Sequence, residues 1–260
     1  MEIDVSRYRV KLAEMPEERE GAQRLRFRVF VEEMGAHATP EQLSARREWD
    51  AFDPYFDHLI LETLDPVADP LDRVVGVYRL MRGEVAEAGP GFYGASEYDL
   101  SPIARSGRRS VELGRSCVAR EHRGGPGMHL LWNGLAGYVL DREIELLFGV
   151  ASFPGTDVAA LAEPLAFLHH THLAPPDLRA RARPEHFVAM DRVPAEAVDP
   201  ARALRAIPPL IKAYLRLGGF VGDGASLDRE FNTVDVCVIM DTGRMTEKYR
   251  AFYERGRRKA

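Results

Sequence analysis

The sequence predicts an α/β fold built around a mixed β-sheet. Two observations carry this prediction: strand-like segments with alternating or β-branched residues, and segments with a helical apolar repeat that separate them. The chain has 260 residues, of which 45% are hydrophobic and 29% are charged, so it can bury a full core. That length suits one large domain or two small ones, and we expect a single domain over residues 1–260.

Six segments are expected to form strands, because they are short, apolar or β-branched, and bounded by turn residues. A turn rich in Asp and Pro, "DPVADPLD", separates the second segment from the third. The segments are 8–13, 58–64, 73–81, 110–119, 145–153 and 233–241.

Helical periodicity is clearest over residues 17–34, where Leu25, Val29, Phe30 and Met34 fall on roughly one face. Residues 35–57 are expected to form a long charged loop with one helical turn, and loops of that length are usually functional or disordered. The other expected helices cover 127–142, 156–168, about 200–217 and part of the chain after 244.

Composition points to a reduced, cytoplasmic enzyme or binding protein. No apolar run reaches the roughly 20 residues of a membrane-spanning helix. The first residues lack the basic and apolar blocks of a signal peptide. Cys117 and Cys237 lie far apart, with no metal-ligand spacing. No nucleic-acid partner is expected.

The net charge of −5 is unevenly distributed. From Arg244 to the end the chain has seven Lys or Arg residues against Glu247 and Glu254, so this tail is basic and the remainder acidic. A basic tail suits an acidic partner protein or an anionic membrane surface. A solvated terminal helix that binds nothing explains the same charges.

The stretch "SVELGRSCVAREHRGGPG" (110–127) joins a strand to a helix through a glycine-rich turn. Glycines let backbone N–H groups approach a ligand, and a helix N-terminus favours anions. A phosphate cradle formed by Gly124, Gly125 and Gly127, with Arg120 and Arg123 nearby, is one interpretation. The other is a turn whose arginines are merely solvated.

Glu112 and Arg115 lie within the strand itself. Strict alternation places them on opposite faces unless a bulge intervenes at Gly114. A carboxylate in a sheet is costly without a partner, so it is either paired structurally or tuned for proton transfer.

Several motifs resemble those of two related acyltransferase families. An Arg-x-x-x-Phe pair, an Asp-x-x-Asp loop, a strand arginine and Glu-x-x-Arg resemble the autoinducer (acyl-homoserine lactone) synthases. The matching residues are Arg26 and Phe30, Asp50 and Asp53, Arg79, and Glu112 and Arg115. Longer motifs resemble the ornithine N-acyltransferases that make lyso-ornithine lipid, a resemblance that extends from Leu25 to Met240. These motifs are "LGRSCVAREHRGG", "FGVASFPG", "PPLIKAYLRLGG" and "GDGASLDREFNTVDVCVIM".

The resemblance implies the GNAT acyltransferase fold, in which a splayed strand pair in a twisted sheet admits a pantetheine arm. Residues from about 175 to 260 would complete the sheet and the pocket for acceptor and acyl chain. The implied reaction moves a 3-hydroxyacyl chain from acyl carrier protein to the α-amino group of L-ornithine. No resident cofactor or metal is implied, since 4′-phosphopantetheine arrives on the carrier protein.

Two features depart from the family patterns. The tryptophan that follows the helix phenylalanine in autoinducer synthases is missing near Met34, which argues against lactone synthesis. The GNAT phosphate signature is only loosely matched by "RGGPG", which leaves the individual phosphate-binding residues open but not their location.

The chemistry and the resemblance together assign roles. Glu112 is the expected base, because burial of a strand carboxylate raises its pKa and the attacking amine must lose a proton. Backbone N–H groups near Cys117 and Val118 would stabilise the oxyanion. The residues expected to bind the acceptor amino acid are Arg26, Phe30, Asp50, Asp53, Arg79, Arg115, Asn232 and Asp235. Those expected to bind phosphopantetheine are Val118, Arg123, Gly124, Gly125 and Gly127.

Alternatives remain at several of these positions. Arg79 pairing with Asp50 or Asp53 simply to hold the loop is as well supported as substrate binding. Cys117 is better explained as a core residue than as a nucleophile, and the "HHTH" cluster (169–172) as structural than as a metal site. A lactone-forming signal synthase using S-adenosylmethionine and a non-catalytic carrier-binding module are the alternative functions. Peripheral contact with an anionic membrane is a further expectation.

Overall fold

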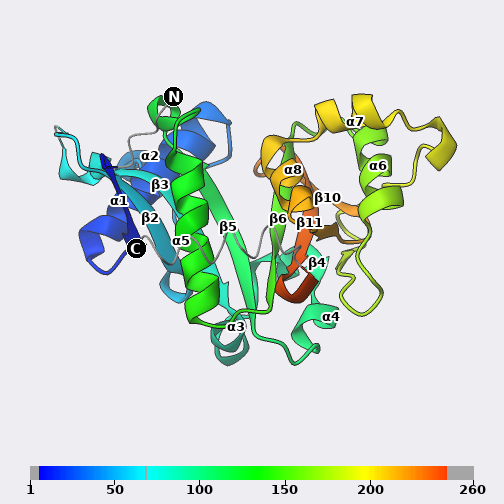
Figure 1. Ribbon diagram of the computed structural model, residues 1–260. Helices are drawn as coiled ribbons and strands as arrows, with labels where there is room; N and C mark the ends of the chain where they lie inside the picture. The colour runs from blue at the N-terminus through cyan, green and yellow to red at the C-terminus, as the bar shows by residue number, and fades with distance from the viewer. Residues whose placement is uncertain (1–5, 68, 245–260) are drawn as a thin grey trace. The chain divides into compact units, whose positions relative to one another are not determined.

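The computed structural model describes residues 6–67 and 69–244 (Figure 1). The chain divides into two compact units, each assembled from separate stretches of sequence. The described residues of unit 1 are 6–67, 69–81 and 113–143, and those of unit 2 are 82–112 and 144–244. Strand β5 (Ser110–Val118) contributes its first three residues to unit 2 and the rest to unit 1.

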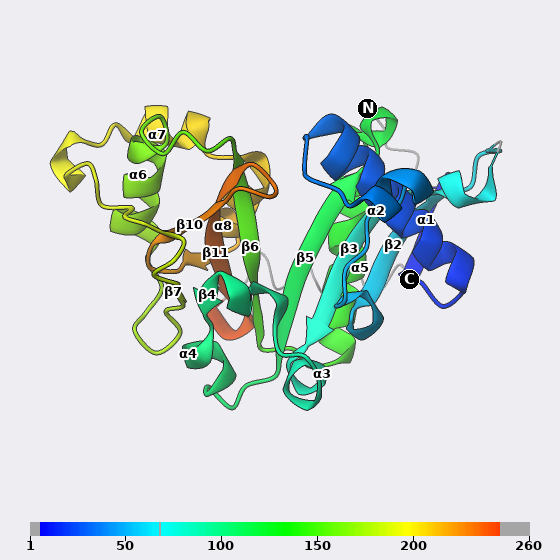
Figure 2. The same ribbon diagram turned by 180° about the vertical axis from the view of Figure 1, so that it is seen from behind.

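Unit 1 contains an antiparallel sheet formed by β1 (Tyr8–Leu12), β2 (Asp57–Thr63) and β3 (Val74–Arg82), next to β5. Helix α5 (Gly127–Asp141) covers one face of these strands and α1 (Pro16–Arg26) covers the other (Figures 1 and 2). Both faces of β2 are therefore buried, in agreement with the unbroken apolar run Leu59–Leu61 at its centre.

The segment between α1 and β2 carries several charged residues, among them Glu48, Asp50 and Asp53. Helix α1 continues without a break as the π-helical segment η1 (Phe27–Glu33), so the helix expected over 17–34 is confirmed. The following loop contains the short helix α2 (Pro40–Ala45) and the 3₁₀ turn η2 (Asp53–Tyr55). Because α1 and η2 both reach β2 and β3, polar side chains from all of them can meet.

Unit 2 is built around two long antiparallel strands, β6 (Leu146–Pro154) and β11 (Thr233–Asp241), which pair over nine residues each. The hairpin partner of β11 is β10 (Ala225–Asp228), which also pairs with β8 (Phe187–Val188). Strand β9 (Phe220–Val221) pairs with the far end of β11. On the other side of β6, residues 110–112 of β5 run parallel to 146–148, so the sheet is mixed as predicted.

Shorter elements surround this sheet. One face of β6 and β11 packs on a core that includes Tyr98, Leu100, Phe148, Cys237 and Ile239. A separate two-stranded sheet joins β4 (Tyr98–Asp99) to β7 (Arg181–Ala182). The remaining helices of unit 2 are α3 (Gly83–Ala88), α4 (Ser101–Ala104), α6 (Ala162–His172), α7 (Pro200–Ala206) and α8 (Pro209–Arg216), with 3₁₀ turns including η4 (Tyr93–Ser96).

Two helix predictions were wrong in their bounds. The helix expected over 156–168 begins only at Ala162, because the Asp157 carboxylate accepts hydrogen bonds from the backbone of Ala159 and Ala160 and holds a turn there. The helix expected over 200–217 is broken between α7 and α8. Pro208 and Pro209 supply no N–H, and the residue before a proline avoids helical geometry.

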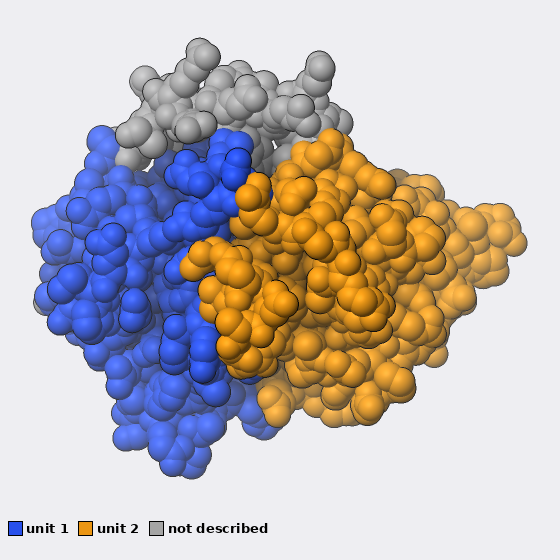
Figure 3. All heavy atoms as spheres, turned by 90° about the horizontal axis from the view of Figure 1, so that it is seen from below, with its two compact units in different colours: residues 1–81, 113–143, 251–260 blue, residues 82–112, 144–250 orange. Residues whose placement is uncertain are grey.

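Figure 3 shows which residues compose each unit. Neither unit is a contiguous half of the sequence, so the expectation of a single domain stays a prediction. The helix expected after Arg244, and the basic residues beyond it, lie outside the described residues.

Candidate active site

The carboxylate of Glu112 is buried and held by two backbone donors. Glu112 is 2% exposed, and its Oε2 and Oε1 atoms accept hydrogen bonds from the N–H groups of Tyr93 (2.7 Å) and Gly94 (2.6 Å). A Cβ atom at position 94 would lie 2.9 Å from Oε1, so glycine permits this close approach. The two donors fix the positions of both carboxylate oxygens.

Unit 2 forms a small pocket beside this carboxylate. Apart from Glu112 and Gly94, its lining residues are Tyr98, Leu100, Phe148, Gly149, Val150 and Cys237. The lining is mostly apolar, and the hydroxyl of Tyr98 donates to the carbonyl oxygens of Gly224 (3.1 Å) and Asp235 (2.9 Å). A buried carboxylate in such surroundings suits a general base.

Arg26 lies at the centre of a buried charge cluster in unit 1. Its side chain is fully buried and donates to both oxygens of Asp53, at 2.9 and 2.7 Å. It also forms an ion pair with Glu48 at 2.6 Å and donates to the Glu48 carbonyl oxygen. Glu48 was not identified from the sequence.

Two further arginines complete this cluster. Arg79, fully buried, contacts Asp50 (2.8 Å) and Asp53 (2.6 Å), and its guanidinium lies 4.3 Å from the ring centre of Phe56. Arg115 forms ion pairs with Glu48 (3.2 Å) and Asp50 (3.5 Å). We call these three arginines and three acids the charge cluster; its members are Arg26, Arg79, Arg115, Glu48, Asp50 and Asp53.

Opposite charges decide how the acids of the charge cluster titrate. Burial alone would raise the pKa of Asp53, but Arg26 and Arg79 outweigh it and hold that pKa well below its usual range. Burial would also raise the pKa of Glu48, but the charges of Arg26 and Arg115 outweigh burial and lower it. The acids and arginines of the charge cluster thus pair with one another. The pairing of Arg79 with Asp50 and Asp53, given above as the alternative to substrate binding, is present in the structure.

The backbone of β5 departs from strand geometry at Arg115. Its φ is +50°, in the left-handed region, which directs its side chain toward Glu48 and Asp50. The irregularity therefore lies at Arg115, one residue after the Gly114 position expected from the sequence. Phe30, the remaining acceptor-site candidate in unit 1, lies half-buried within η1.

His58 supports the loop that carries Asp53. It is 2% exposed, and its Nε2 lies 3.2 Å from the Asp53 carbonyl oxygen, the geometry of a neutral imidazole donating to that carbonyl. Burial, reinforced by the charge of Arg26, lowers the pKa of His58 to about 4. The folded protein therefore resists protonation of this ring.

Stability should depend on pH through His58. In the unfolded chain the ring takes up a proton below about pH 6.5, whereas in the folded chain it does so only near pH 4, so stability is retained above 6.5 and falls between these values. The expected slope is about 1.4 kcal/mol per pH unit. Urea unfolding of wild type and His58→Gln at pH 7 and pH 5 measures it. The variant should lose less stability between the two pH values, and equal losses would contradict this role.

The glycine-rich turn ends at the first turn of α5. Gly124 has a φ of +75°, and no heavy atom lies within 4 Å of a Cβ placed there. Gly127 is the first residue of α5, where a Cβ would lie 3.3 Å from the His122 carbonyl oxygen. Arg123 donates to the Val118 carbonyl oxygen (2.8 Å) and forms an ion pair with Glu33 (2.8 Å). Its position is therefore fixed, with its side chain 43% exposed.

The two candidates on the β10–β11 hairpin have different environments. Asn232 is exposed in the turn, with a φ of +54°. Asp235 is 3% exposed and lies near Glu97 and Asp228. Burial, together with the charge of Asp228, raises the pKa of Asp235 to about 6. Of these two candidates, Asp235 is buried near other polar groups and Asn232 is exposed.

Comparison with known proteins identifies the family. The family model described as "Acetyltransferase (GNAT) domain" matches residues 25–133. L-ornithine N(alpha)-acyltransferase of Rhodobacter capsulatus is 56% identical over 248 residues, covering 95% of each chain. The protein of the same name from Agrobacterium fabrum is 43% identical, covering 94% of this chain and 84% of that one. The chain belongs to the L-ornithine N(alpha)-acyltransferase family.

Membership in the L-ornithine N(alpha)-acyltransferase family makes the chain an acyltransferase and confirms the resemblance seen in its motifs. The solved structure of FeeM, an N-acyl amino acid synthase from uncultured soil microbes, matches with a TM-score of 0.51 at 11% identity, covering 92% of each chain. That likeness concerns the fold alone and agrees with the GNAT-like α/β architecture predicted from the sequence.

The structure shows the surroundings of Cys117 and of the histidine cluster, which were considered above as a nucleophile and as a metal site. Cys117 is buried, and burial raises the pKa of its thiol to about 12, so the nucleophilic thiolate is disfavoured. In the "HHTH" cluster, the Nε2 atom of His170 lies 3.0 Å from the Val193 carbonyl oxygen. Within residues 6–67 and 69–244, no helix is both long and apolar enough to cross a bilayer.

Proposed function

We propose that this protein transfers a 3-hydroxy fatty acyl group from acyl carrier protein to the α-amino group of L-ornithine, forming lyso-ornithine lipid. The observation that carries the proposal is the 56% identity, over 95% of both chains, to a protein named L-ornithine N(alpha)-acyltransferase. The buried and oriented carboxylate of Glu112 supports it chemically.

The reaction needs a base because ornithine arrives as an ammonium ion. Glu112 takes a proton from the α-ammonium, directly or through a water, and the free amine attacks the thioester carbonyl carbon. The tetrahedral oxyanion is stabilised by backbone N–H groups near Cys117 and Val118. Its collapse forms the amide and breaks the C–S bond, and the carrier's thiolate receives a proton. No cofactor resident in the protein takes part in this scheme.

The donor's phosphate is assigned to the glycine-rich turn. Gly124 and Gly125 leave the backbone open before α5, while Gly127 is closely packed at its first turn, where N–H groups lack partners within the helix. Arg123 is fixed beside them by Val118 and Glu33. An anion bound there meets both helix donors and a guanidinium.

Replacing Arg123 tests this assignment. Arg123→Ala should raise the KM for the acyl donor by about 10-fold, the value of one charge-assisted contact, and leave that for ornithine within about 2-fold. Glu33→Gln is the matched control, since it breaks the Arg123–Glu33 ion pair but keeps the guanidinium. Steady-state kinetics with each substrate varied distinguishes the two. A change in KM for ornithine alone would show that this turn does not bind the acyl donor.

Product analysis tests the proposed function itself. Purified protein is incubated with L-ornithine and 3-hydroxyacyl carrier protein, and the products are identified by mass spectrometry. An Nα-acyl ornithine is expected. A lactone formed only with S-adenosylmethionine would indicate a signal synthase, and carrier binding without turnover would indicate a binding module.

The partners of this reaction are acyl carrier protein, L-ornithine and, through the amphiphilic product, an anionic membrane surface reached from the cytoplasm. Basic residues near such a surface each contribute about 1 kcal/mol. Of the seven basic residues counted from the sequence, Arg244 is described, and its guanidinium lies 3.4 Å from Asp241. The others lie outside the described residues, so their role remains a proposal from the sequence.

A further inference from the structure

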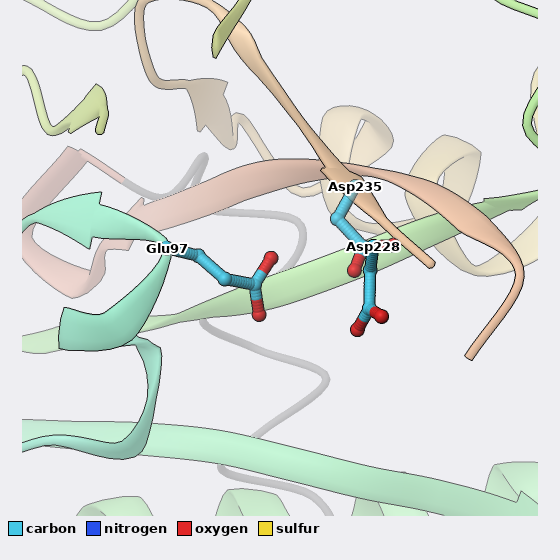
Figure 4. Close-up of side chains that lie close together, drawn as sticks. All are labelled: Glu97, Asp228 and Asp235. Atoms are coloured by element: carbon cyan, nitrogen blue, oxygen red, sulfur yellow. The ribbon is translucent and has the colours of Figure 1, made fainter. Parts of the chain in front are cut away.

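Unit 2 contains a second polar group, separate from Glu112, made of three carboxyl groups from different segments. Glu97 precedes β4, Asp228 ends β10 and Asp235 lies in β11. Their oxygen atoms lie within 4.8 Å of one another. Figure 4 shows the carboxyl group of Glu97 extending toward Asp228 and Asp235. We call these three residues the carboxyl cluster.

Two buried oxygens at the carboxyl cluster lack hydrogen-bond partners. The Asp235 carboxyl group interacts with Ser152, Thr233 and Glu97, but its Oδ1 atom is buried and has no hydrogen-bond partner. Ser226, fully buried, also has an unpaired Oγ atom. Ser226 is the cross-strand neighbour of Asp235, so both side chains lie on the same face of the β10–β11 hairpin. Unpaired buried acceptors are costly and mark the position of a missing donor.

Two acids of the carboxyl cluster have no cationic partner among the described residues. In the described part of the chain, neither Asp228 nor Asp235 forms an ion pair with a lysine or arginine, in contrast to the acids of the charge cluster. The Oδ1 atom of Asp228 accepts hydrogen bonds from the backbone of Glu230 and Phe231, and its Oδ2 atom takes no part in that turn. Both Glu97 and Asp228 are half-buried, so the carboxyl cluster is reached from solvent.

The oxygens of the carboxyl cluster offer acceptors to a primary ammonium. An –NH₃⁺ group carries three donors, and each needs an acceptor. Acceptors arranged tetrahedrally about 2.8 Å from one nitrogen are about 4.6 Å apart, whereas ligands at right angles around Ca²⁺ are only about 3.4 Å apart. The oxygens of the carboxyl cluster lie within 4.8 Å of one another, an upper limit that admits both arrangements, so the test below includes metal ions as well as an ammonium.

The carboxyl cluster lies two strand positions from residues that line the pocket at Glu112. Cys237 and Val150 line that pocket and pair with each other, and two residues along the same strands Asp235 pairs with Ser152. Residues two apart share a face and are separated by about 7 Å. The two nitrogens of extended ornithine are joined by five bonds, which places them about 6 Å apart. One further methylene, as in lysine, adds about 1.3 Å.

We propose that the carboxyl cluster, with Ser226, binds the side-chain ammonium of the acceptor amino acid while its α-amine lies beside Glu112. This inference rests on the proposed function for the position of the α-amine. It gives Asp235, already expected to bind the acceptor, the role of holding the side-chain ammonium, and adds Glu97, Asp228 and Ser226. The site thereby selects for a terminal ammonium on a three-carbon side chain.

Comparison of L-ornithine with L-norvaline, which has the same side chain without the ammonium, tests this site. Wild type should bind and acylate ornithine in preference to norvaline. Asp235→Asn and Asp228→Asn should each lower kcat/KM for ornithine by about 10- to 100-fold, and leave that for norvaline within about 2-fold. Asp228→Asn retains the oxygen that holds the hairpin turn, so it guards against a folding defect in the buried Asp235 variant. Glu163→Gln, at an exposed ion pair on α6, is the control.

Ser226→Ala separates ligand binding from structure. Removing an unpaired buried hydroxyl should leave thermal stability unchanged or raised, while ornithine binding measured by calorimetry weakens by about 3- to 10-fold. Equal losses for ornithine and norvaline in the Asp variants, or ornithine binding that requires added Ca²⁺ or Mg²⁺, would overturn the ammonium site. Selective binding of ornithine without acylation would instead refute the proposed function and leave the site standing.

Discussion

Replacing Glu112 with Gln is expected to lower kcat by about 10²- to 10⁴-fold, the usual contribution of a positioned general base. An amide cannot accept the proton of the attacking ammonium. The variant keeps the size of the side chain, but its NH₂ group must face one of the two backbone donors, Tyr93 or Gly94. Turnover at saturating substrates measures the loss.

The loss of the base must be separated from the disturbance caused by an NH₂ group facing a backbone donor. Gly94→Ala is the matched control, since it keeps the carboxylate but places a Cβ 2.9 Å from the present position of Oε1. It should lower activity less than Glu112→Gln. An acceptor whose amine is unprotonated at the assay pH should restore activity to Glu112→Gln selectively, because it needs no base. A folded Glu112→Gln variant with near-wild-type turnover would remove Glu112 from the mechanism.

Replacing Arg79 with Met should lower the free energy of unfolding by about 3–5 kcal/mol, the cost of breaking a buried ion pair from one side. Arg79 is fully buried, and its removal leaves Asp50 and Asp53 with one cation fewer. Urea unfolding gives this difference directly. The control is Arg46→Met, at an exposed ion pair with Glu32, which should cost no more than about 1 kcal/mol.

The same variant decides between the two roles considered for Arg79. A structural role lowers stability and leaves the KM for ornithine unchanged in whatever protein remains folded. Unchanged stability with a raised KM would return Arg79 to the acceptor site. Because Arg26 and Arg115 share partners with Arg79, their effects on stability should not add.

The strands were predictable because their signals are local. Strand β11 was predicted over its observed range, since β-branched residues alternate throughout it and the "DREFN" turn precedes it. Strands of two residues, such as β8 and β9, were missed because alternation needs more positions to be visible. The break between α7 and α8 was missed although Pro208 and Pro209 marked it, because the apolar repeat on either side is strong.

The site was predictable only where a motif named its residues. Arg26, Asp53 and Arg79 follow a motif, but a motif does not state that they bind one another. Glu48 lies in the charged run "ARREWD", where no local pattern indicates which acid will be buried. Glu97 and Asp228 are brought together by the sheet of unit 2 from segments far apart along the chain, so their proximity depends on the whole topology.

The pairing of β6 with β11 has a consequence during synthesis. The two strands are about 80 residues apart, so at 5–20 residues per second β6 waits about 4–16 s on the ribosome before its partner is made. Its sequence, "LLFGVASF", is apolar and uncharged, and an open edge of that kind pairs readily with other chains. The yield of this acyltransferase in a cell therefore depends on what shields the nascent β6 edge during that interval, in addition to the stability of the finished fold.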